Sequence, residues 1–501
     1  MGKAVVTSSE RELLDNTHPS RWQNPPANGR YNLVVVGAGT AGLVCAAGAA
    51  SLGARVALVE RRRLGGDCLN YGCVPSKALL RCARAAAEAR RAADFGVHVP
   101  GPVEVDFVSV MGRMRLLRAE ISRHDSAARF RGLGVDVFLG EARFSGPAAV
   151  EVGGQTLHFA RAVIATGGRP APLELPGLGP EDYLTNETVF DLDELPRRLV
   201  VVGAGPIGCE LGQAFRRFGS DVTLVNRSPG LLGKEGPDAV AVVRSRLEAE
   251  GVRLELGARP VAAERSNGGL VLVVERAGQT ARLAADALLV AVGRRPNVEG
   301  LGLEQVGVEY DSHGVKVNDY LQTTNRNVYA AGDVCSPYKF THAADAMARV
   351  VLRNALFFGR ARVSDLVIPW CTYTDPEVAH VGLTAEEAAR RGVEIKTFKV
   401  PLSEVDRAVL DGEVDGFAAA HVRRGGDRIV GATVVAAHAG EMIGEVVLAM
   451  TRGLGLLALS QTIHPYPTQA EVLRRLGDAW QKTRLTPRRA SLLRALLRWR
   501  R

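Results

Sequence analysis

Residues 31–61 read YNLVVVGAGTAGLVCAAGAASLGARVALVER, and this stretch decides the fold. An apolar run leads into a turn with the spacing G-x-G-x-x-G, made of Gly37, Gly39 and Gly42. An alanine-rich stretch follows, and a second apolar run ends at Glu60. This order is typical of a dinucleotide-binding strand–turn–helix–strand unit, in which the glycines let a pyrophosphate approach the helix N-terminus. Glu60 is then placed to accept hydrogen bonds from ribose hydroxyls.

The same pattern recurs in residues 199–228, LVVVGAGPIGCELGQAFRRFGSDVTLVNRS, with Gly203, Gly205 and Gly208 at the same spacing. Two complete copies indicate an internal duplication with two dinucleotide sites. At the ribose position of the second copy, Asn226 and then Arg227 stand where the first copy has its acid. No carboxylate repels a 2′-phosphate there, and Arg227 and Lys234 supply cations, so the pattern favours NADPH over NADH. The alternative is that Arg227 is a solvated loop charge and Asn226 serves either cofactor.

Three further glycine-rich segments follow apolar runs: AVIATGG (162–168), LLVAVGRRPN (288–297) and NVYAAGDV (327–334). We expect them to be strand ends that line the nucleotide sites, with candidate binding residues Thr166, Gly167, Gly293, Gly332 and Asp333. An acid at the end of a buried strand can bind a ribityl hydroxyl. It can equally cap the following helix, and the residues alone favour neither reading for Asp333.

Cys68 and Cys73 lie in the segment GGDCLNYGCVPSKALL (65–80). On an ideal helix the rise along the axis between their Cα atoms alone would be about 7.5 Å, more than the roughly 7 Å that a disulfide tolerates. A disulfide therefore needs a distorted turn, which Gly72 and Pro75 allow. Metal ligation and two buried thiols are the alternatives, and no second Cys/His pair with zinc spacing supports the former. We interpret the remaining cysteines as packing thiols: Cys45, Cys82, Cys209, Cys335 and Cys371.

Together these segments resemble the pyridine nucleotide-disulfide oxidoreductases, the flavoenzyme family of lipoamide dehydrogenase, glutathione reductase and mercuric reductase. The resemblance covers about 31–480 and implies an α/β fold with two Rossmann-like dinucleotide-binding domains, for FAD and NAD(P)H, and a C-terminal α+β dimerisation domain. The expected division is an N-terminal extension (1–30), an FAD-binding domain in two parts (31–183 and 299–366), an NAD(P)-binding domain (184–298), the dimerisation domain (367–480) and a basic amphipathic tail (481–501).

The resemblance also implies that Cys68 and Cys73 form a redox-active disulfide beside the FAD, fed by hydride from NADPH. Cys73 is then the cysteine next to the flavin, and Cys68 is the thiolate that exchanges with substrate. Lys77 resembles the family's lysine near the flavin, and Glu210 resembles its ion-pair partner. A buried lysine without such an acid would be costly.

The segment TIHPYPTQAE (462–471) departs from the thiol-disulfide members, in which the partner subunit supplies a histidine within H-P-T-x-x-E. Alignment on P-T-x-x-E matches more residues and places Tyr466 at the histidine position, with Glu471 as the acid. Alignment on His-Pro places His464 there instead. With a pKa of about 10, tyrosine is a poor proton shuttle, which argues against efficient lipoamide or glutathione turnover. His464 is then either a second polar group of the site or a histidine of the subunit interface whose hydrogen bonds are satisfied there.

A tyrosine at this position resembles mercuric reductase, whose substrate Hg²⁺ is a soft ion that prefers sulfur. Cys68 and Cys73 would hold that ion transiently, as substrate. The cysteines run only from Cys45 to Cys371, so the C-terminal cysteine pair and the N-terminal metal-binding module of typical mercuric reductases have no counterpart. There are two alternatives. One is a reductase of another disulfide, of a quinone or of an unidentified oxidant, similar to dihydrolipoamide dehydrogenase. The other is a membrane-associated flavoprotein whose catalysis is incidental.

The net charge of +9 over 501 residues comes almost entirely from the sequence KTRLTPRRASLLRALLRWRR (482–501), which carries +8 and no acid. The rest is nearly neutral, so the charge does not point to nucleic acid. Leucines and Trp499 recur in the tail at helical spacing, which suits an interfacial helix on anionic lipid or a helix docked on the dimer. No apolar run reaches the roughly 18 residues of a membrane span, and the N-terminus does not resemble a signal peptide. We therefore expect a cytoplasmic homodimer with a small-molecule or metal-ion substrate, peripheral to the inner membrane face if the tail binds lipid.

Overall fold

The computed structural model of the chain describes residues 7–266 and 269–501. These residues form two compact units, and each is described by itself. The first holds the chain up to Pro229 together with Arg253–Leu366, and the second holds Gly230–Val252 together with Val367–Arg501.

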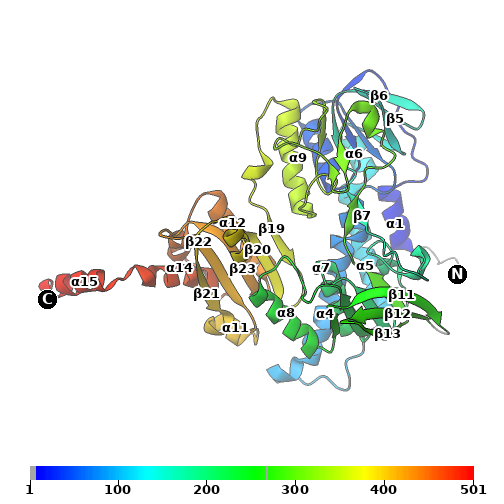
Figure 1. Cartoon of the computed structure of the whole chain (residues 1–501). Coiled ribbons are helices and arrows are strands. Elements are labelled where there is room, and N and C mark those ends of the chain that lie inside the picture. The colour runs from blue at the N-terminus through cyan, green and yellow to red at the C-terminus, as the bar shows by residue number, and fades with distance from the viewer. Residues whose placement is uncertain (1–6, 267–268) are drawn as a thin grey trace. The chain divides into compact units, whose positions relative to one another are not determined.

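The first glycine-rich pattern lies in a seven-stranded sheet with the order β3-β2-β1-β6-β5-β4, in which β18 also pairs with β6. Its parallel strands are β1 (Arg30–Val36), β2 (Val56–Glu60), β3 (Val135–Leu139), β6 (Gln155–Ile164) and β18 (Val328–Ala330). The strands β4 (Ala142–Gly146) and β5 (Ala149–Val152) extend it antiparallel. The helices α2 (Thr40–Ser51) and α9 (Thr341–Leu356) pack against each other beside this sheet (Figure 1).

The second pattern lies in a four-stranded parallel sheet with the order β10-β9-β8-β14. Its strands are β8 (Arg198–Val202), β9 (Asp221–Asn226), β10 (Arg253–Leu256) and β14 (Ala287–Val290), and α7 (Pro206–Phe218) follows β8. An antiparallel sheet of β11 (Arg259–Ser266), β12 (Gly269–Arg276) and β13 (Gln279–Ala285) packs beside it. The predicted duplication of strand–turn–helix–strand units is confirmed.

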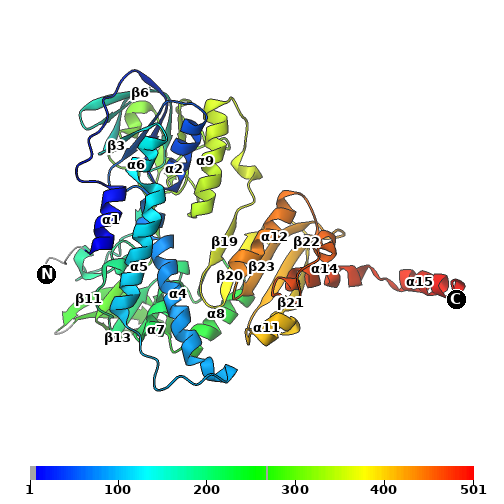
Figure 2. The ribbon, with the colours of Figure 1, turned by 180° about the vertical axis from the view of Figure 1, so that it is seen from behind.

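Helices between β2 and β3 carry the two cysteines that the sequence singled out. They are α3 (Gly66–Tyr71), α4 (Cys73–Arg90), α5 (Phe107–Ser122) and α6 (Ala127–Gly132). The helices α4 and α5 pack along each other, and α4 also packs on α7 (Figure 2). In this way α4 connects the cysteine segment to α7, the helix that follows the second glycine-rich turn.

The second unit is an α+β fold around an antiparallel sheet with the order β19-β20-β23-β22-β21. The strands are β19 (Pro369–Thr372), β20 (Glu377–Gly382), β21 (Ile395–Pro401), β22 (Phe417–Arg423) and β23 (Ile429–Ala436). Its helices are α8 (Pro237–Ala249), α10 (Ala385–Arg390), α11 (Asp406–Leu410), α12 (Ala439–Thr451), α13 (Leu456–Gln461), α14 (Glu471–Arg484) and α15 (Pro487–Trp499). This agrees with the expected α+β class, whereas the finer domain boundaries stay a prediction.

From Thr7 onward, the N-terminal extension is a folded part of the first unit. Its helix α1 (Ser8–Thr17) packs on α5, and Leu13 forms a small buried cluster with Leu69 of α3 and Ala119 of α5. The Asn16 amide donates to the Ser122 hydroxyl at 2.9 Å. Leu69 directly follows Cys68, so this extension supports the helix that carries one of the two cysteines.

We expect Leu13→Ala to lower the free energy of unfolding by about 2–5 kcal/mol, because it leaves a cavity between three helices. Denaturant titration of the purified protein measures this loss. Leu52→Ala is the matched control, since Leu52 is 61% exposed and exposed substitutions usually change stability by less than about 0.5 kcal/mol. Equal effects of the two substitutions would contradict the packing role of α1.

Candidate functional site

Cys68 and Cys73 lie on two different helices that are separated by a break at Gly72. Cys68 is in α3, and Cys73 is the first residue of α4. A Cβ atom on Gly72 would lie 3.0 Å from the carbonyl oxygen of Asp67, so a larger residue there would crowd the break. The structure thus contains the distorted turn that the sequence required, and the two free thiols are close enough to share a hydrogen bond.

The two thiols differ in acidity. The hydrogen bond from Cys68, a second one with the Thr341 hydroxyl at 3.3 Å and the positive charge of Lys77 lower the pKa of Cys73 to about 6. The same shared hydrogen bond and burial raise the pKa of Cys68. The thiolate of the reduced pair therefore resides on Cys73, at the N-terminus of α4, where the helix dipole also favours an anion.

Lys77 and Glu210 form the ion pair that the resemblance implied. The Lys77 ammonium lies 2.8 Å from a Glu210 carboxylate oxygen. Glu210, on α7, is buried, whereas the Lys77 side chain on α4 is partly exposed. The Glu210 carboxylate, which follows the second glycine-rich turn, thus holds the Lys77 ammonium in place one helical turn after Cys73.

Arg294 links the cysteine helix to the strand-end acid Asp333. Its guanidinium lies 3.3 Å from Asp67, the neighbour of Cys68, and 3.5 Å from Asp333. It also donates to the Gly168 carbonyl at 2.9 Å. Burial raises the pKa of Asp333, and the charge of Arg294 opposes that rise. Asp333 is therefore held at the site by a cation rather than by a capping contact with α9.

The first glycine-rich turn has the geometry expected of a pyrophosphate site. Gly37 has φ +104°, and a Cβ on Gly42 would collide with the Gly37 carbonyl oxygen. Gly39 caps α2, so the amides at that N-terminus are not blocked by a side chain. The Glu60 carboxylate, which burial shifts to a higher pKa, accepts from the Ala38 amide at 2.7 Å.

The second turn repeats this geometry. Gly203 has φ +110°, Gly205 caps α7, and a Cβ on Gly208 would collide with the Gly203 carbonyl oxygen. The Asn226 side-chain oxygen accepts from the Ala204 amide at 3.4 Å, as Glu60 does in the first copy. Arg227 is exposed beside it.

The other glycine-rich segments meet one another. The Thr166 hydroxyl donates to the Asn297 carbonyl at 2.7 Å, and the Asn297 amide donates to the Gly167 carbonyl at 2.9 Å. The strands β7 (Gly168–Pro170) and β15 (Arg294–Pro296) pair directly, and the carbonyl of Gly293 accepts from the Ala171 amide. Gly332, with φ +82°, precedes Asp333 at the end of β18.

In the second unit, Tyr466 and Glu471 have different partners. Tyr466 is 71% exposed, and its hydroxyl donates to the Asp406 carboxylate at 2.9 Å, which raises the tyrosine pKa. Glu471 is buried and accepts from Arg474 at 2.5 Å, with Arg475 at 3.5 Å. Glu471, expected to be the acid beside the tyrosine, is instead paired with the arginines of α14. The acid that contacts Tyr466 is Asp406.

His464 forms a pair with an acid that the sequence reasoning missed. Its Nε2 lies 3.0 Å from Glu445 of α12, its Nδ1 lies 3.1 Å from the Thr462 carbonyl, and its side chain is only 6% exposed. Glu445 precedes His464 by 19 residues, whereas the H-P-T-x-x-E pattern has its acid after the histidine.

Thr341 and Arg294 were also missed. Arg294 had a usable signal, because it directly follows Gly293 in a segment already singled out. Thr341 had none, since it is separated from Cys73 by 268 residues and meets it only through the packing of α9.

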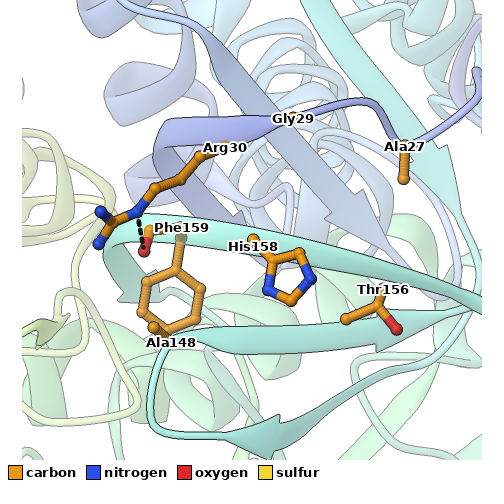
Figure 3. A pocket seen from close by; sticks show the side chains of 7 residues that line it. All are labelled: Ala27, Gly29, Arg30, Ala148, Thr156, His158 and Phe159. Atoms are coloured by element: carbon orange, nitrogen blue, oxygen red, sulfur yellow. Dashed lines mark hydrogen bonds between the residues drawn. The ribbon is translucent and has the colours of Figure 1, made fainter.

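A surface pocket lies at the opposite end of the first sheet. It is formed near the start of β1 and β6 by Ala27, Gly29, Arg30, Ala148, Thr156, His158 and Phe159 (Figure 3). Ligands of open α/β sheets bind beyond the carboxyl ends of the strands, where Gly37 lies, so this pocket is not the nucleotide site. Within residues 7–266 and 269–501, no cluster of three or more His, Cys, Asp or Glu side chains is placed to hold a metal ion.

Two nucleotide-binding turns around a dithiol define a flavin- and pyridine-nucleotide-dependent disulfide oxidoreductase. Residues 31–348 match the family model "Pyridine nucleotide-disulphide oxidoreductase", and residues 368–476 match the dimerisation domain of the same family. The chain belongs to this family.

Its relatives have two different activities. The chain is 37% identical to a dihydrolipoyl dehydrogenase of Thermus scotoductus, over 90% of this chain and 98% of the relative. It is 35% identical to a mercuric reductase of Staphylococcus aureus, over 89% and 82% respectively. Two solved structures are also similar. The HOCl-induced flavoprotein disulfide reductase RclA from Escherichia coli is 28% identical, with a TM-score of 0.79 over 89% of this chain and 99% of RclA. LpdA from Mycobacterium tuberculosis is 27% identical, with a TM-score of 0.82 over 89% of this chain and 99% of LpdA.

The family depends on FAD and uses NAD(P)H as electron donor, and the residues described above fit both groups. The turn at Gly37–Gly42, Glu60 and Asp333 would hold the FAD, and the turn at Gly203–Gly208 with Asn226 would hold the nicotinamide nucleotide. When bound, the FAD supplies a two-electron carrier between the nicotinamide and the dithiol. The chain itself supplies the cation at Lys77 and the low pKa of Cys73.

We expect the long-wavelength thiolate-to-flavin absorbance of the NADPH-reduced enzyme to be lost as the pH falls through about 6, because Cys73 becomes protonated there. Thr341→Val should raise that midpoint by roughly one pH unit, since a hydrogen bond to a charged group contributes about 1.5 kcal/mol. Anaerobic pH titration measures the midpoint. Thr341→Ser keeps the hydroxyl and should keep the wild-type value, and identical midpoints in all three proteins would exclude the contact.

Proposed function

We propose that this enzyme uses NADPH to reduce a soft metal ion such as Hg²⁺ by way of FAD and the Cys68–Cys73 pair. NADPH gives up a hydride, and Hg²⁺ takes its two electrons, so that the products are NADP⁺, a proton and the neutral metal. The two thiolates bind the ion and are thiolates again when the metal leaves. The enzyme class itself is that of the family, and the metal substrate is the proposal.

The observation that carries this proposal is the state of Tyr466. The alignment on P-T-x-x-E puts it where thiol-disulfide relatives have a proton-shuttling histidine, and its hydrogen bond to Asp406 raises its pKa further. A tyrosine in this state gives up no proton at neutral pH. Reduction of a thiolate-bound metal ion needs no such transfer, because no substrate thiol has to be protonated.

The unequal acidity of the dithiol also supports a metal substrate. Metal ligation requires deprotonated cysteines, and Cys73 is ionised above about pH 6, so only Cys68 must lose a proton on binding. Two thiolates form a soft ligand set. A mercuric reductase is among the relatives, and a solved relative 28% identical to this chain is a Cu(II) complex of RclA.

A second candidate is the reduction of a disulfide or the oxidation of a dithiol, as in the dihydrolipoyl dehydrogenase relative. The observation in its favour is the pair formed by His464 and Glu445 at 3.0 Å. A histidine held by a carboxylate can accept and return a proton near neutral pH, which thiol-disulfide exchange requires.

Variants of His464 and Tyr466 separate the two candidates. NADPH oxidation is measured with Hg²⁺ in excess thiol and, separately, with lipoamide and other disulfides. For a metal substrate we expect Hg²⁺-dependent turnover that Cys68→Ser abolishes and that His464→Gln and Tyr466→Phe change by less than about threefold, because no general acid takes part.

For a disulfide or dithiol substrate, His464→Gln should lower turnover by about 10²–10⁴-fold, the usual contribution of a general acid–base. A lack of Hg²⁺-dependent turnover in the wild-type enzyme would refute the metal proposal. Anaerobic NADPH titration provides the control, because the long-wavelength band reports on the dithiol without any substrate.

The NADPH preference is tested at Asn226. We expect Asn226→Glu to lower kcat/KM for NADPH by about tenfold or more, through repulsion of the 2′-phosphate, and to change it much less for NADH. Steady-state kinetics with both nucleotides measure the ratio, and Asn226→Gln is the uncharged control. An unchanged ratio in Asn226→Glu would mean that this position does not read the 2′-group.

We infer that the enzyme works as a homodimer in the cytoplasm, with the tail at a membrane surface. The dimerisation-domain match supports a homodimer, as do apolar side chains that the second unit leaves exposed, namely Leu448, Leu454, Leu457 and Ile463. Among the described residues, no helix has both the length and the apolarity to cross a bilayer. Any membrane contact of those residues through a helix would therefore be peripheral.

A further inference from the structure

The C-terminal helix α15 is exposed along nearly its whole length. Thr486 caps its N-terminus by accepting from the Arg489 amide at 3.4 Å, and Pro487 occupies the first turn, so the helix has a defined start. None of its residues is buried. Both views show it beyond the end of α14, to which it is joined by residues 485–486 (Figures 1 and 2).

The apolar side chains of α15 form one continuous row. Leu492 and Leu496 are one turn apart, as are Leu493 and Leu497, and Trp499 lies two turns after Leu492. These five side chains are between 48% and 83% exposed. An exposed apolar row of this length is unfavourable in water and marks a surface that binds something.

Two of the cations of α15 occupy the side of the helix opposite the leucines. Arg494 and Arg498 are one turn apart and project from the face away from Leu492 and Leu496, as a period of 3.6 residues requires. Residues 482–501 contain eight Lys and Arg and no acid, whereas residues 1–481 hold 55 Lys and Arg against 54 Asp and Glu. The charge is therefore concentrated on this one segment.

This combination identifies the kind of partner. A solvated basic helix would not need a leucine row, and a tail that docks on another protein would not need the eight cations of residues 482–501 without a single acid. An apolar row flanked by arginines matches the interface of a bilayer, where the leucines enter the acyl boundary and the arginines reach anionic headgroups. Tryptophan is favoured at that depth.

We propose that residues 485–501 anchor this enzyme to the surface of anionic phospholipid membranes, with α15 lying in the plane of the interface. The inference specifies the membrane contact named above and rests on the tail alone. It does not depend on which electron acceptor the dithiol reduces.

The test is co-sedimentation of the full-length holoenzyme with vesicles. One set is pure phosphatidylcholine and the other contains about 30% phosphatidylglycerol, to provide the negative surface that attracts basic segments. We expect at least tenfold stronger binding to the anionic vesicles, with loss of most of that gain at high salt. Fluorescence of Trp499 should shift to shorter wavelength on binding, and Trp499→Phe should remove the shift.

Point variants assign the binding to the helix. Leu492→Glu/Leu496→Glu should abolish vesicle binding, and Arg494→Gln/Arg498→Gln should weaken it several-fold. Leu116→Glu is the matched control, because Leu116 is an exposed helical leucine of α5. All variants should keep the NADPH-induced long-wavelength absorbance, which verifies that the flavin and dithiol are intact.

Three results would overturn the proposal. The first is equal or negligible binding to both kinds of vesicle. The second is stronger binding to double-stranded DNA than to anionic vesicles, unaffected by Leu492→Glu/Leu496→Glu, which would make the tail a nucleic-acid segment. The third is conversion of a dimer to a monomer by that double variant in sedimentation, which would make α15 part of the dimer.

Discussion

The break between α3 and α4 at Gly72 is the constraint on which the redox site depends. A continuous helix would separate the Cα atoms of the two cysteines by a rise of about 7.5 Å along its axis, beyond the reach of a disulfide. The break places Cys73 at the start of a new helix instead, next to Thr341 and one turn from Lys77. Every influence that lowers the pKa of Cys73 within this chain follows from that placement: a shared hydrogen bond, a hydroxyl, a cation and a helix N-terminus.

The surrounding elements act on α3 and α4 as supports from several directions. Asp67 is held by Arg294 and by the Asn186 amide at 3.1 Å, and the Leu69 side chain packs on the N-terminal helix α1. Glu210, on the helix α7 that follows the second glycine-rich turn, holds the Lys77 ammonium in place. A dithiol that exchanges electrons with a cofactor needs fixed geometry, because its reactivity depends on small differences in distance and acidity. Apart from α1, the segments that make these contacts lie more than 100 residues away in the sequence.

The sequence predicted what local patterns encode. The two glycine-rich turns, Glu60 and Asn226 at the ends of their strands, and the need for a distorted turn after Cys68 all follow from spacing over a few residues. The Lys77–Glu210 pair required a family resemblance, because 133 residues separate its members. Thr341, Arg294 and Glu445 were missed since their roles arise from packing between distant helices and strands. The residues before 30 were expected only to form an extension, and the helix α1 within it was not predicted, because a few apolar side chains such as Leu13 give little periodic signal.

The second unit contains two different proton-handling arrangements, and the difference between them bears on the substrate. Tyr466 is exposed and held by Asp406, which keeps its proton in place. His464 is nearly enclosed, and its Nε2 lies 3.0 Å from a Glu445 carboxylate oxygen. Thiol–disulfide exchange needs a group that can accept and return a proton each time a disulfide bond is made or broken. A metal ion held by two thiolates needs neither group, because its reduction transfers only electrons and the thiolates keep their charge. The substrate proposed above is therefore one whose chemistry is completed at the dithiol itself, since the exposed tyrosine keeps its proton.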